Sequence, residues 1–356
     1  MRHHGPVNLG DGHAPGSENS SDPATKVERV FDIDPTSVRT AERSGGTPSL
    51  SPVQPGSDDE AERAALVALL RTRPGGLTWQ QIASEVVERR SATAVWREQV
   101  QADLFSVDEQ PSALGDARRD VERWQAAGLG LLTVLDDDYP TQLREIHELP
   151  PVLFHRGTLR TDEFGVSVVG SRAASVRGLQ LAGVLARGLV DRGVSVVSGL
   201  AAGIDAAAHT AALDAGGRTV AVIGTGITRC YPPQNRALQD RVAAEGLVLS
   251  QFWPDAPPRP HQFPLRNAVM SGFGRATVVV EAGEKSGARI QARLAVAHGR
   301  PVILTDLVVT SNDWARRLVG LPGVHVASST NEVLTRVEAI ADEQDQVRRL
   351  LGSAAE

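Results

Sequence analysis

Hydrophobic and polar positions divide the chain into stretches of different character. Residues 1–57 are rich in Gly, Pro, Ser and Asp and show no sustained apolar period, so we expect a disordered N-terminal tail. From residue 58 apolar positions recur at helical spacing. They predict helices in "DDEAERAALVALLRTRPGG", in "LTWQQIASEVVERR" with Thr78 as its cap, and near the start of "ALGDARRDVERWQAAGLGLLTVLDDDYPTQLREI".

From Val166 onward, short apolar runs alternate with helical stretches. The predicted strands are "GVSVVG", "GVSVVSG", "RTVAVIG", "GLVLSQF", "ATVVVEA", "PVILT" and "GVHVA". The predicted helices between them cover residues 175–192, 203–216, 233–244, 286–298 and 330–341. Strands separated by helices are typical of a parallel sheet covered on both faces. The sequence therefore predicts an α/β fold with a Rossmann-like, doubly wound, mostly parallel sheet.

These patterns give a domain organisation in five parts. We expect the disordered tail (1–57), a small helical module (58–123), a connecting segment with a short strand at 131–135 (124–160), the Rossmann-like domain (161–341) and a C-terminal tail (342–356).

Composition narrows the functional classes. The single cysteine, Cys230, excludes an intramolecular disulfide framework and indicates a cytoplasmic location. The sequence has no apolar run of about 18 residues and no apolar signal region at its start, so we expect neither a membrane span nor a secretory signal. It shows no Ser-His-Asp order, activated cysteine or regular metal-ligand spacing. We therefore expect no enzymatic activity, no metal and no cofactor.

Glycine-containing turns follow three consecutive predicted strands. In sheets of this kind ligands bind outside the carboxyl ends of the strands, and the start of the next helix, near Ser175, offers free N–H groups to an anion. We therefore predict a groove for a phosphate-bearing ligand, against the alternative that the turns only pack. Its candidate residues are Gly170, Ser171, Arg172, Ser198, Gly199, Gly203, Asp205, Gly224, Gly226, Tyr231 and Asn235.

Known nucleotide fingerprints are absent from these turns. The spacing is not GxGxxG, and GxxxxGK[ST] occurs nowhere in the sequence, which disfavours nicotinamide, flavin and ATP-hydrolysing sites.

A basic belt lies between Arg259 and Arg300. It contains seven Lys or Arg residues against two acidic residues, although the whole chain has a net charge of −6. An aromatic residue among arginines, here Phe263, can stack on a base while the cations hold the backbone. We expect the belt and the glycine turns to form one electropositive trough, with Arg172 and Arg266 on the same side. The alternative is that Phe263 is a core residue and several arginines line a solvated helix face.

Six motifs in this order resemble the DprA/Smf family of DNA-processing proteins, over about residues 124–305. They are "VVGSR", "VVSGLAAGIDAAAH", "TVAVIGTGITRCYPPQN", "FPLRN", "VVVEAGEKSGA" and "ARLAVAHGR". The resemblance implies a cytoplasmic bacterial protein that binds single-stranded DNA without cutting it. It also implies protection of incoming strands during natural transformation, transfer of them to the RecA recombinase, and a homodimer formed through the Rossmann-like domain.

The resemblance also assigns roles to single residues. Arg172 with Gly170 and Ser171 would grip a phosphate, Ser198, Gly199, Gly203 and Asp205 would shape the adjoining pocket, and Phe263 would stack on a base. Arg266 and Asn267 would contact the strand, and Glu281, Ser286 and Gly287 would serve as scaffold and helix cap. The sequence departs from the family pattern at Ala268 (usually arginine), at Gln291 (usually threonine) and over 305–323, and it ends without room for the winged helix of many members.

Two other functions remain open at this point. A nucleotide-binding sensor or a phosphoribohydrolase-like protein of the same superfamily would use Glu281, which ends the "TVVVEA" strand. A structural or partner-binding protein, for example in phage defence, would keep the fold without the ligand.

Overall fold

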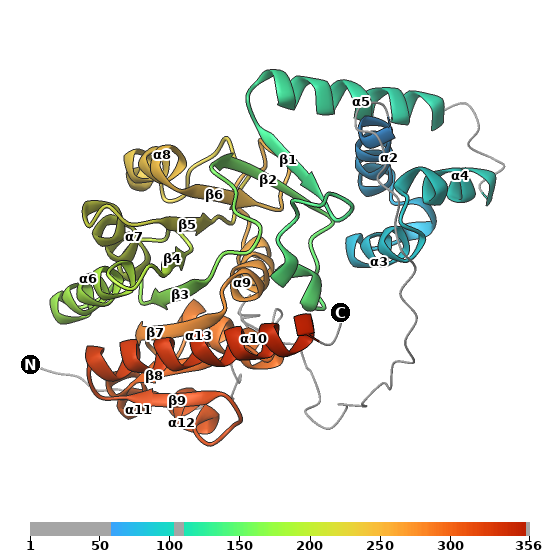
Figure 1. Cartoon of the computed structure of the whole chain (residues 1–356). Helices are drawn as coiled ribbons and strands as arrows, with labels where there is room; N and C mark the ends of the chain where they lie inside the picture. Colours follow the sequence, from blue (N-terminus) through green and yellow to red (C-terminus); the bar gives the residue numbers. More distant parts are fainter. Residues whose placement is uncertain (1–57, 103–109, 354–356) are drawn as a thin grey trace, which may run out of the picture. The chain divides into compact units, whose positions relative to one another are not determined.

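The computed structural model describes residues 58–102 and 110–353 of the chain. The expected tail, residues 1–57, lies outside these ranges. Within them, nine strands form one sheet in the order β1-β2-β6-β5-β4-β3-β7-β8-β9 (Figure 1). The strands are β1 (Gly130–Thr133), β2 (Val152–Gly157), β3 (Gly165–Gly170), β4 (Ser195–Ser198), β5 (Thr219–Val222), β6 (Leu247–Ser250), β7 (Ala276–Glu281), β8 (Val302–Thr305) and β9 (Val324–Ala327).

The sheet is mostly parallel, as the sequence predicts. Every pair of neighbours from β3 to β9 runs parallel, whereas β2 is antiparallel to β6 and β1 is antiparallel to β2. β1 and β2 fall in the segment 124–160 that the sequence analysis treats as a connection, so this segment extends the sheet. The chain builds outward from β3 through β4, β5 and β6 and then returns to the other side of β3 with β7. The topological switch therefore lies between β3 and β7.

Helices cover both faces of the sheet (Figure 1). One face is covered by α6 (Val176–Val190), α7 (Ile204–Asp214) and α13 (Thr330–Ser353), and the other by α9 (Gln262–Phe273) and α10 (Gly287–Ala297). The remaining helices of this half are α8 (Arg236–Glu245), α11 (Asp306–Ser311) and α12 (Asp313–Leu318), with 3-10 turns η2 (Thr141–Glu145) and η3 (Pro233–Asn235).

Alternate residues of the central strand β3 face opposite cores, which explains why apolar residues occupy consecutive positions in it. In β3, Val168 belongs to the buried cluster that includes Leu185 of α6. The next residue, Val169, belongs to the cluster that includes Phe273 of α9. Since successive side chains of a strand point to opposite faces, both faces need buried residues, and the one polar residue, Ser167, is satisfied by a hydrogen bond to the Met270 carbonyl at 3.2 Å.

Several helices differ from the pattern-based expectation, since α4 (Ala92–Ala102), α9, α11 and α12 form where none is predicted and α13 is longer than predicted. α9 forms within a stretch for which no helix is predicted, and it carries both Phe263 and Arg266. Its proline, Pro264, lies in the first turn, where a missing N–H breaks no helical hydrogen bond. α13 continues to Ser353, through residues that the sequence analysis assigned to a C-terminal tail.

The helical module precedes the sheet. It consists of α2 (Asp58–Thr72), η1 (Pro74–Gly76), α3 (Trp79–Arg89), α4 (Ala92–Ala102) and α5 (Gln110–Ala126). The predicted cap is confirmed, because the Thr78 hydroxyl accepts from the Gln81 N–H and the Gln81 side chain accepts from the Thr78 N–H at 2.9 Å. None of the helices in the described ranges has the length and apolar character needed to cross a membrane.

A tryptophan cluster joins this module to the sheet. Trp253, in the loop after β6, lies with its ring centroid 5.2 Å from that of Trp79 and 5.7 Å from that of Trp124. The Arg71 guanidinium lies 4.9 Å from the Trp253 centroid. These separations are typical of favourable aromatic and cation–π contacts, so the cluster fixes the module against the loop after β6.

The loop that contains Trp253 also supports the loop after β5. The carbonyl of Ala256 accepts a hydrogen bond from the Gly226 N–H at 2.9 Å. The carbonyl of Pro254 accepts from both the N–H and the hydroxyl of Thr228, at 3.0 and 2.6 Å. The supported loop continues to Tyr231.

Candidate nucleic-acid interface

Loops from several segments meet at the carboxyl end of the sheet, beside the topological switch. The Ile204 N–H, at the start of α7, donates to the Ser171 carbonyl at 3.2 Å and joins the loops after β3 and β4. The Arg266 side chain from α9 reaches the carbonyls of Gly199 and Val222, at the ends of β4 and β5. The geometry thus brings together the turns that the sequence analysis expected to share one edge.

Two arginines and two aromatic rings form the centre of this region, which we call the arginine–aromatic cluster (Arg172, Tyr231, Phe263 and Arg266). The Phe263 ring centroid lies 5.7 Å from that of Tyr231 and 5.3 Å from the Arg172 guanidinium carbon. The Arg266 guanidinium carbon lies 5.9 Å from the same centroid. Arg172 and Tyr231 are exposed, Phe263 is half-buried and Arg266 is buried. The two arginines therefore face one ring, one from solvent and one from inside.

Arg266 has a different place from the one expected. It is 5 % exposed, and its Nε donates to Asn267 Oδ1 at 3.0 Å while Nη1 donates to the carbonyls of Gly199 and Val222. Burial lowers the pKa of Arg266 to about 10, and the nearby Asp205 opposes this effect. Arg266 is thus a buried cation that holds loops together. The contact between Arg266 and a DNA strand that the resemblance implies stays a prediction, and three acceptors of the protein already engage this side chain.

Asp205 and Arg266 fix the loop after β4 from opposite sides. The Asp205 carboxylate accepts from the N–H groups of Gly199 and Ala201, at 3.1 and 3.3 Å, whereas Arg266 binds the Gly199 carbonyl. Burial raises the pKa of Asp205, and the positive charge of Arg266 counteracts that rise. Between the two amides, Leu200 has a positive φ of 57°, and its carbonyl accepts from Asn235 Nδ2 at 2.9 Å. A non-glycine residue holds this conformation only where its surroundings impose it, so the loop is rigid.

The glycines of these turns make room for protein side chains. A Cβ on Gly224 would lie 2.8 Å from Cδ1 of Phe263, and a Cβ on Gly199 would overlap the Arg266 guanidinium. Gly170, Gly203 and Gly226 are likewise packed against neighbouring backbone or side-chain atoms. The glycines therefore let the arginine–aromatic cluster approach the strand ends, which differs from the open phosphate cradle expected from their spacing.

Two serines of the expected groove are engaged by the backbone. Ser198 is fully buried, and its hydroxyl donates to the Val168 carbonyl at 2.6 Å, so it stabilises the sheet and offers nothing to a ligand. The Ser171 N–H donates to the main-chain carbonyl of Glu281 at 2.6 Å, and its hydroxyl accepts from the Ala173 N–H at 3.2 Å.

The start of α6 is also engaged, in contrast to the expected free N–H groups. Glu281 Oε1 accepts from the Ser175 N–H at 2.8 Å, and Oε2 accepts from the Ser175 hydroxyl at 2.5 Å. The Ser175 hydroxyl in turn caps the helix by accepting from the Gly178 N–H at 3.0 Å. A carboxylate of the protein thus lies where the sequence analysis expected a ligand phosphate.

The last group of predicted residues joins α9 to α10. The buried Asn267 donates from Nδ2 to the Gly287 carbonyl at 3.3 Å. The Ser286 hydroxyl caps α10 by accepting from the Ala288 N–H at 3.2 Å. These contacts are structural, and they place Gly287 at an exposed helix start.

The basic belt does not form one trough. Arg275 and Arg300 precede β7 and β8, so they lie at the amino ends of these strands, away from the arginine–aromatic cluster. Arg300 donates to Glu145 at 2.6 Å, and Arg275 lies 3.7 Å from Glu145 and 3.5 Å from Asp162. With Arg266 buried as well, three of the seven cations of the belt are used inside the protein, and the expected continuous trough is wrong.

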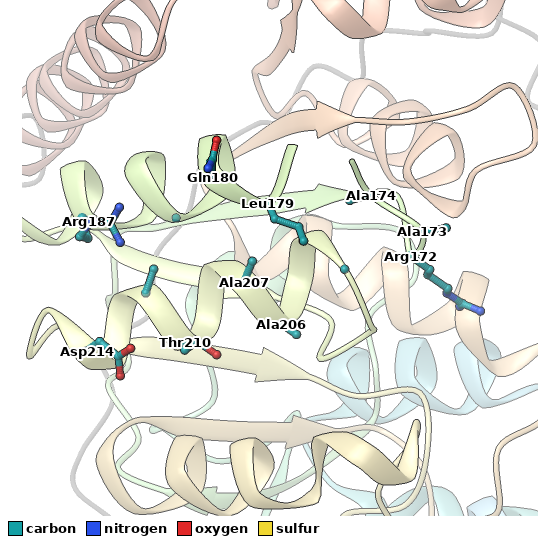
Figure 2. A pocket seen from close by; sticks show the side chains of 13 residues that line it. Arg172, Ala173, Ala174, Leu179, Gln180, Arg187, Ala206, Ala207, Thr210 and Asp214 are labelled. Atoms are coloured by element: carbon teal, nitrogen blue, oxygen red, sulfur yellow. The ribbon is translucent and has the colours of Figure 1, made fainter. Parts of the chain in front are cut away.

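A shallow groove adjoins the cluster. It has a volume of about 750 Å³, begins at Arg172 and follows the surfaces of α6 and α7 to Arg187 and Asp214 (Figure 2). Alanine and glycine residues line most of it, and neither Phe263 nor Tyr231 does. The two rings therefore form a surface beside this groove, and Arg172 belongs to both.

The sequence analysis missed the helix that places Phe263 and Arg266. Their spacing of three residues puts them on one side of a helix, and Gly274 marks its end, so a signal was present.

Comparisons with known proteins identify relatives of the sequence and of the fold. The model of the DNA recombination-mediator protein A family matches residues 130–335, more than half of the chain. The Smf protein of Synechocystis is 44% identical over 187 residues, which cover 51% of this chain and 47% of the relative. DprA of Streptococcus pneumoniae is 41% identical over 209 residues, which cover 58% of this chain and 73% of the relative. The chain thus spans about half of the Synechocystis protein.

Two solved structures resemble the fold. The X-ray structure of S. pneumoniae DprA matches with a TM-score of 0.61 at 32% identity, covering 78% of this chain and 97% of that structure. DprA of Helicobacter pylori, studied for its single-stranded DNA binding mode, matches with a TM-score of 0.53 at 22% identity, covering 59% and 96%.

Proposed function

The chain belongs to the DNA recombination-mediator protein A family, and from this premise we propose that it binds single-stranded DNA across the arginine–aromatic cluster, in the cytoplasm and without cutting the strand. The observation that carries the proposal is the convergence of Arg172, Tyr231 and Phe263 from three separate segments beside the topological switch. Ligands of open α/β sheets bind at this position.

Arg172 has the properties of a phosphate contact. Its side chain is exposed, and among the residues that the structure describes no carboxylate lies within ion-pair distance of it. A guanidinium can donate two parallel hydrogen bonds to a phosphate, and the bond is stronger than one between neutral groups. Arg172 is therefore free to neutralise a phosphate of the strand.

Phe263 and Tyr231 have the properties of a stacking surface. Gly224 lies against the Phe263 ring, and Arg266 faces that ring from inside, so the ring is supported before a ligand arrives. Stacking of a base on an aromatic side chain contributes about 1–3 kcal/mol and tolerates any base. We expect binding with little sequence preference.

The test is a titration of fluorescent oligothymidylate followed by anisotropy at two salt concentrations. We expect Arg172→Ala to weaken binding about fivefold or more and to reduce the salt dependence by about one released counterion. We expect Phe263→Ala to weaken binding by about tenfold, because a stacking contact is lost.

Arg177→Ala is the matched control. Arg177 lies in the first turn of α6, five residues after Arg172, and lines a different hollow together with Thr305 and Asp306. Its removal should change affinity less than about twofold. If Arg172→Ala and Phe263→Ala bind as tightly as this control, the DNA site does not lie at the cluster.

The wider role of the family extends the proposal. We propose protection of incoming DNA during natural transformation, transfer to a RecA-type recombinase, and a homodimer. Two of the family departures concern buried positions, Ala268 in α9 and Gln291 in α10, whereas the third, residues 305–323, includes α11, α12 and exposed residues such as Val319. Sedimentation of the free chain tests the dimer, and a recombinase-loading assay on coated DNA tests the transfer.

The nucleotide-hydrolase alternative receives less support. It depends on Glu281 as a free carboxylate, and this carboxylate accepts two hydrogen bonds from Ser175. Incubation with nucleoside monophosphates, with release of the free base as the readout, tests it directly.

A further inference from the structure

Glu281 binds the start of α6 through both its side chain and its backbone. It ends β7, next to the end of β3, at the topological switch. Its two carboxylate oxygens accept from the N–H and the hydroxyl of Ser175, and its carbonyl accepts from the Ser171 N–H. One acidic residue therefore holds both the turn after β3 and the helix that follows.

The carboxylate also lies close beside the first turn of the helix. A Cβ on Gly178 would overlap Oε2 of Glu281, so the carboxylate lies along the first turn, from Ser175 to Gly178. In dinucleotide-binding Rossmann folds, this place at the start of the helix after the first strand receives the ligand phosphate. Here the negatively charged Glu281 carboxylate interacts favourably with the helix N-terminus in place of a ligand.

We propose that Glu281 is a specificity-determining residue that excludes phosphate monoesters. Nucleoside monophosphates and terminal phosphates of a strand would have to occupy the place of its carboxylate. Internal phosphodiesters avoid this place, because they can lie over the exposed Arg172. This inference deepens the proposed function, and its claim about phosphodiesters rests on it.

Charge and volume act together in this exclusion. A phosphate monoester carries close to two negative charges at neutral pH, and a neighbouring carboxylate repels it. A phosphodiester carries one negative charge, and it is an internal linkage rather than a terminal group that has to fit beside the helix start. The difference predicts that the protein binds oligonucleotides with and without a 5′-phosphate about equally well.

The experiment compares the wild type with Glu281→Ala, with inorganic phosphate and thymidine monophosphate as probes in calorimetric titrations. We expect no saturable binding of either probe by the wild type. We expect Glu281→Ala to bind thymidine monophosphate about tenfold more tightly or better, because the helix start becomes open to an anion. Glu281→Ser, which keeps a hydroxyl near Ser175, carries the test if the alanine variant does not fold.

Glu284→Gln is the control for charge. Glu284 lies three residues away on the same loop, and its carboxylate accepts from the Asp313 N–H, at the start of α12. This variant removes the same charge without opening the start of α6, so it should not gain phosphate binding.

A second arm uses hexathymidylate with a 5′-hydroxyl or a 5′-phosphate. The wild type should bind both within about twofold, and Glu281→Ala should prefer the phosphorylated strand by about fivefold or more. A wild-type preference for the phosphorylated strand overturns the proposal. So does a folded Glu281→Ala that gains no phosphate binding, because a purely structural role would only lower its thermal stability. If the wild type binds no oligonucleotide, the proposed function fails, and the phosphate titration still decides the role of Glu281.

Discussion

Two arginine-containing regions lie at opposite ends of the same parallel strands, and they differ in what surrounds the cations. At the carboxyl end, Arg172 is exposed beside two aromatic rings and has no carboxylate close to it in the described part of the chain. At the amino end, Arg275 and Arg300 have side chains only 11% and 10% exposed and share Glu145 as a partner. The electrostatic potential at each end of the sheet therefore depends on the carboxylates that lie beside the arginines. The number of arginines alone does not determine it.

The carboxyl end also contains two kinds of arginine. Arg172 is exposed, whereas Arg266 is buried and donates to Asn267 Oδ1 and to two backbone carbonyls. Substitutions should separate these roles, because loss of the first affects affinity and loss of the second affects folding.

Arg266→Ala should have the largest effect. The substitution leaves the carbonyls of Gly199 and Val222 without their donor and removes the positive charge that opposes the effect of burial on Asp205. Each buried polar group left without a partner costs about 1–3 kcal/mol, so the free energy of unfolding should fall by about 3 kcal/mol or more. Urea denaturation measures the loss. Arg172→Ala serves as the comparison and should change stability by less than about 0.5 kcal/mol. Equal stabilities of the two variants would contradict the distinction between them.

Lowering the pH should destabilise the protein through a second buried group near Arg266, the imidazole of His209. His209 is fully buried with Nδ1 2.7 Å from the Thr219 hydroxyl, and burial together with Arg266 lowers the pKa of His209 to about 3. As the pH falls below about 6.5, the unfolded chain binds a proton that the folded protein does not bind until the pH reaches its lower pKa. Stability should therefore fall by about 1 kcal/mol per pH unit between roughly pH 6 and pH 4.

Urea denaturation of the wild type and of His209→Gln over this pH range isolates the contribution. The variant should lose less stability on acidification than the wild type. If both proteins lose the same amount, His209 does not control this pH dependence.

Gly224→Ala should weaken DNA binding without unfolding the protein. The added methyl group would lie 2.8 Å from Cδ1 of Phe263, so the ring must move away from the strand end. We expect about a tenfold loss of affinity for oligothymidylate, comparable to the loss of a stacked base. Gly283→Ala is the control, since no neighbouring atom lies within 4 Å of its added Cβ. Unchanged affinity in Gly224→Ala would mean that the position of the Phe263 ring does not matter for binding.

Arg300→Ala should have the smallest effect and tests the other end of the sheet. It removes hydrogen bonds to Glu145 and to the Gln142 carbonyl, at 2.6 and 3.1 Å. Stability should fall by about 1 kcal/mol, as for a partly exposed ion pair, and DNA affinity should stay within about twofold of the wild type. A loss of affinity as large as that of Arg172→Ala would break the comparison between the two ends.

The fold could be predicted because the strands are short apolar runs separated by helices. The seven predicted strands from residue 165 onward correspond to β3–β9 within about two residues at each end. The carboxyl ends of parallel strands lie at one edge, so the meeting of the turns after β3, β4 and β5 followed from topology. Whether each polar side chain in these turns faces solvent did not follow, because it depends on partners from other segments.

Arg266 and Arg300 show in two ways how far the surroundings of a side chain can be predicted from the sequence. The buried Arg266 donates to the carbonyls of Gly199 and Val222, 67 and 44 positions earlier, and no local sequence pattern predicts such partners. The place of Arg300 was within reach, since it lies directly before the predicted strand "PVILT" and so at the amino end of the sheet. The direction of a strand therefore indicates at which end of the sheet a neighbouring arginine lies. A count of the arginines along the sequence does not indicate this.

The loop that contains Trp253 contacts both the N-terminal helices and the loop after β5, at the carboxyl end of the sheet. One side of this loop bears α3 and α5 through Trp79 and Trp124, and the other side holds the loop that ends at Tyr231. One indole and a few peptide groups thus support both the helical module and the loop that leads to the exposed Tyr231.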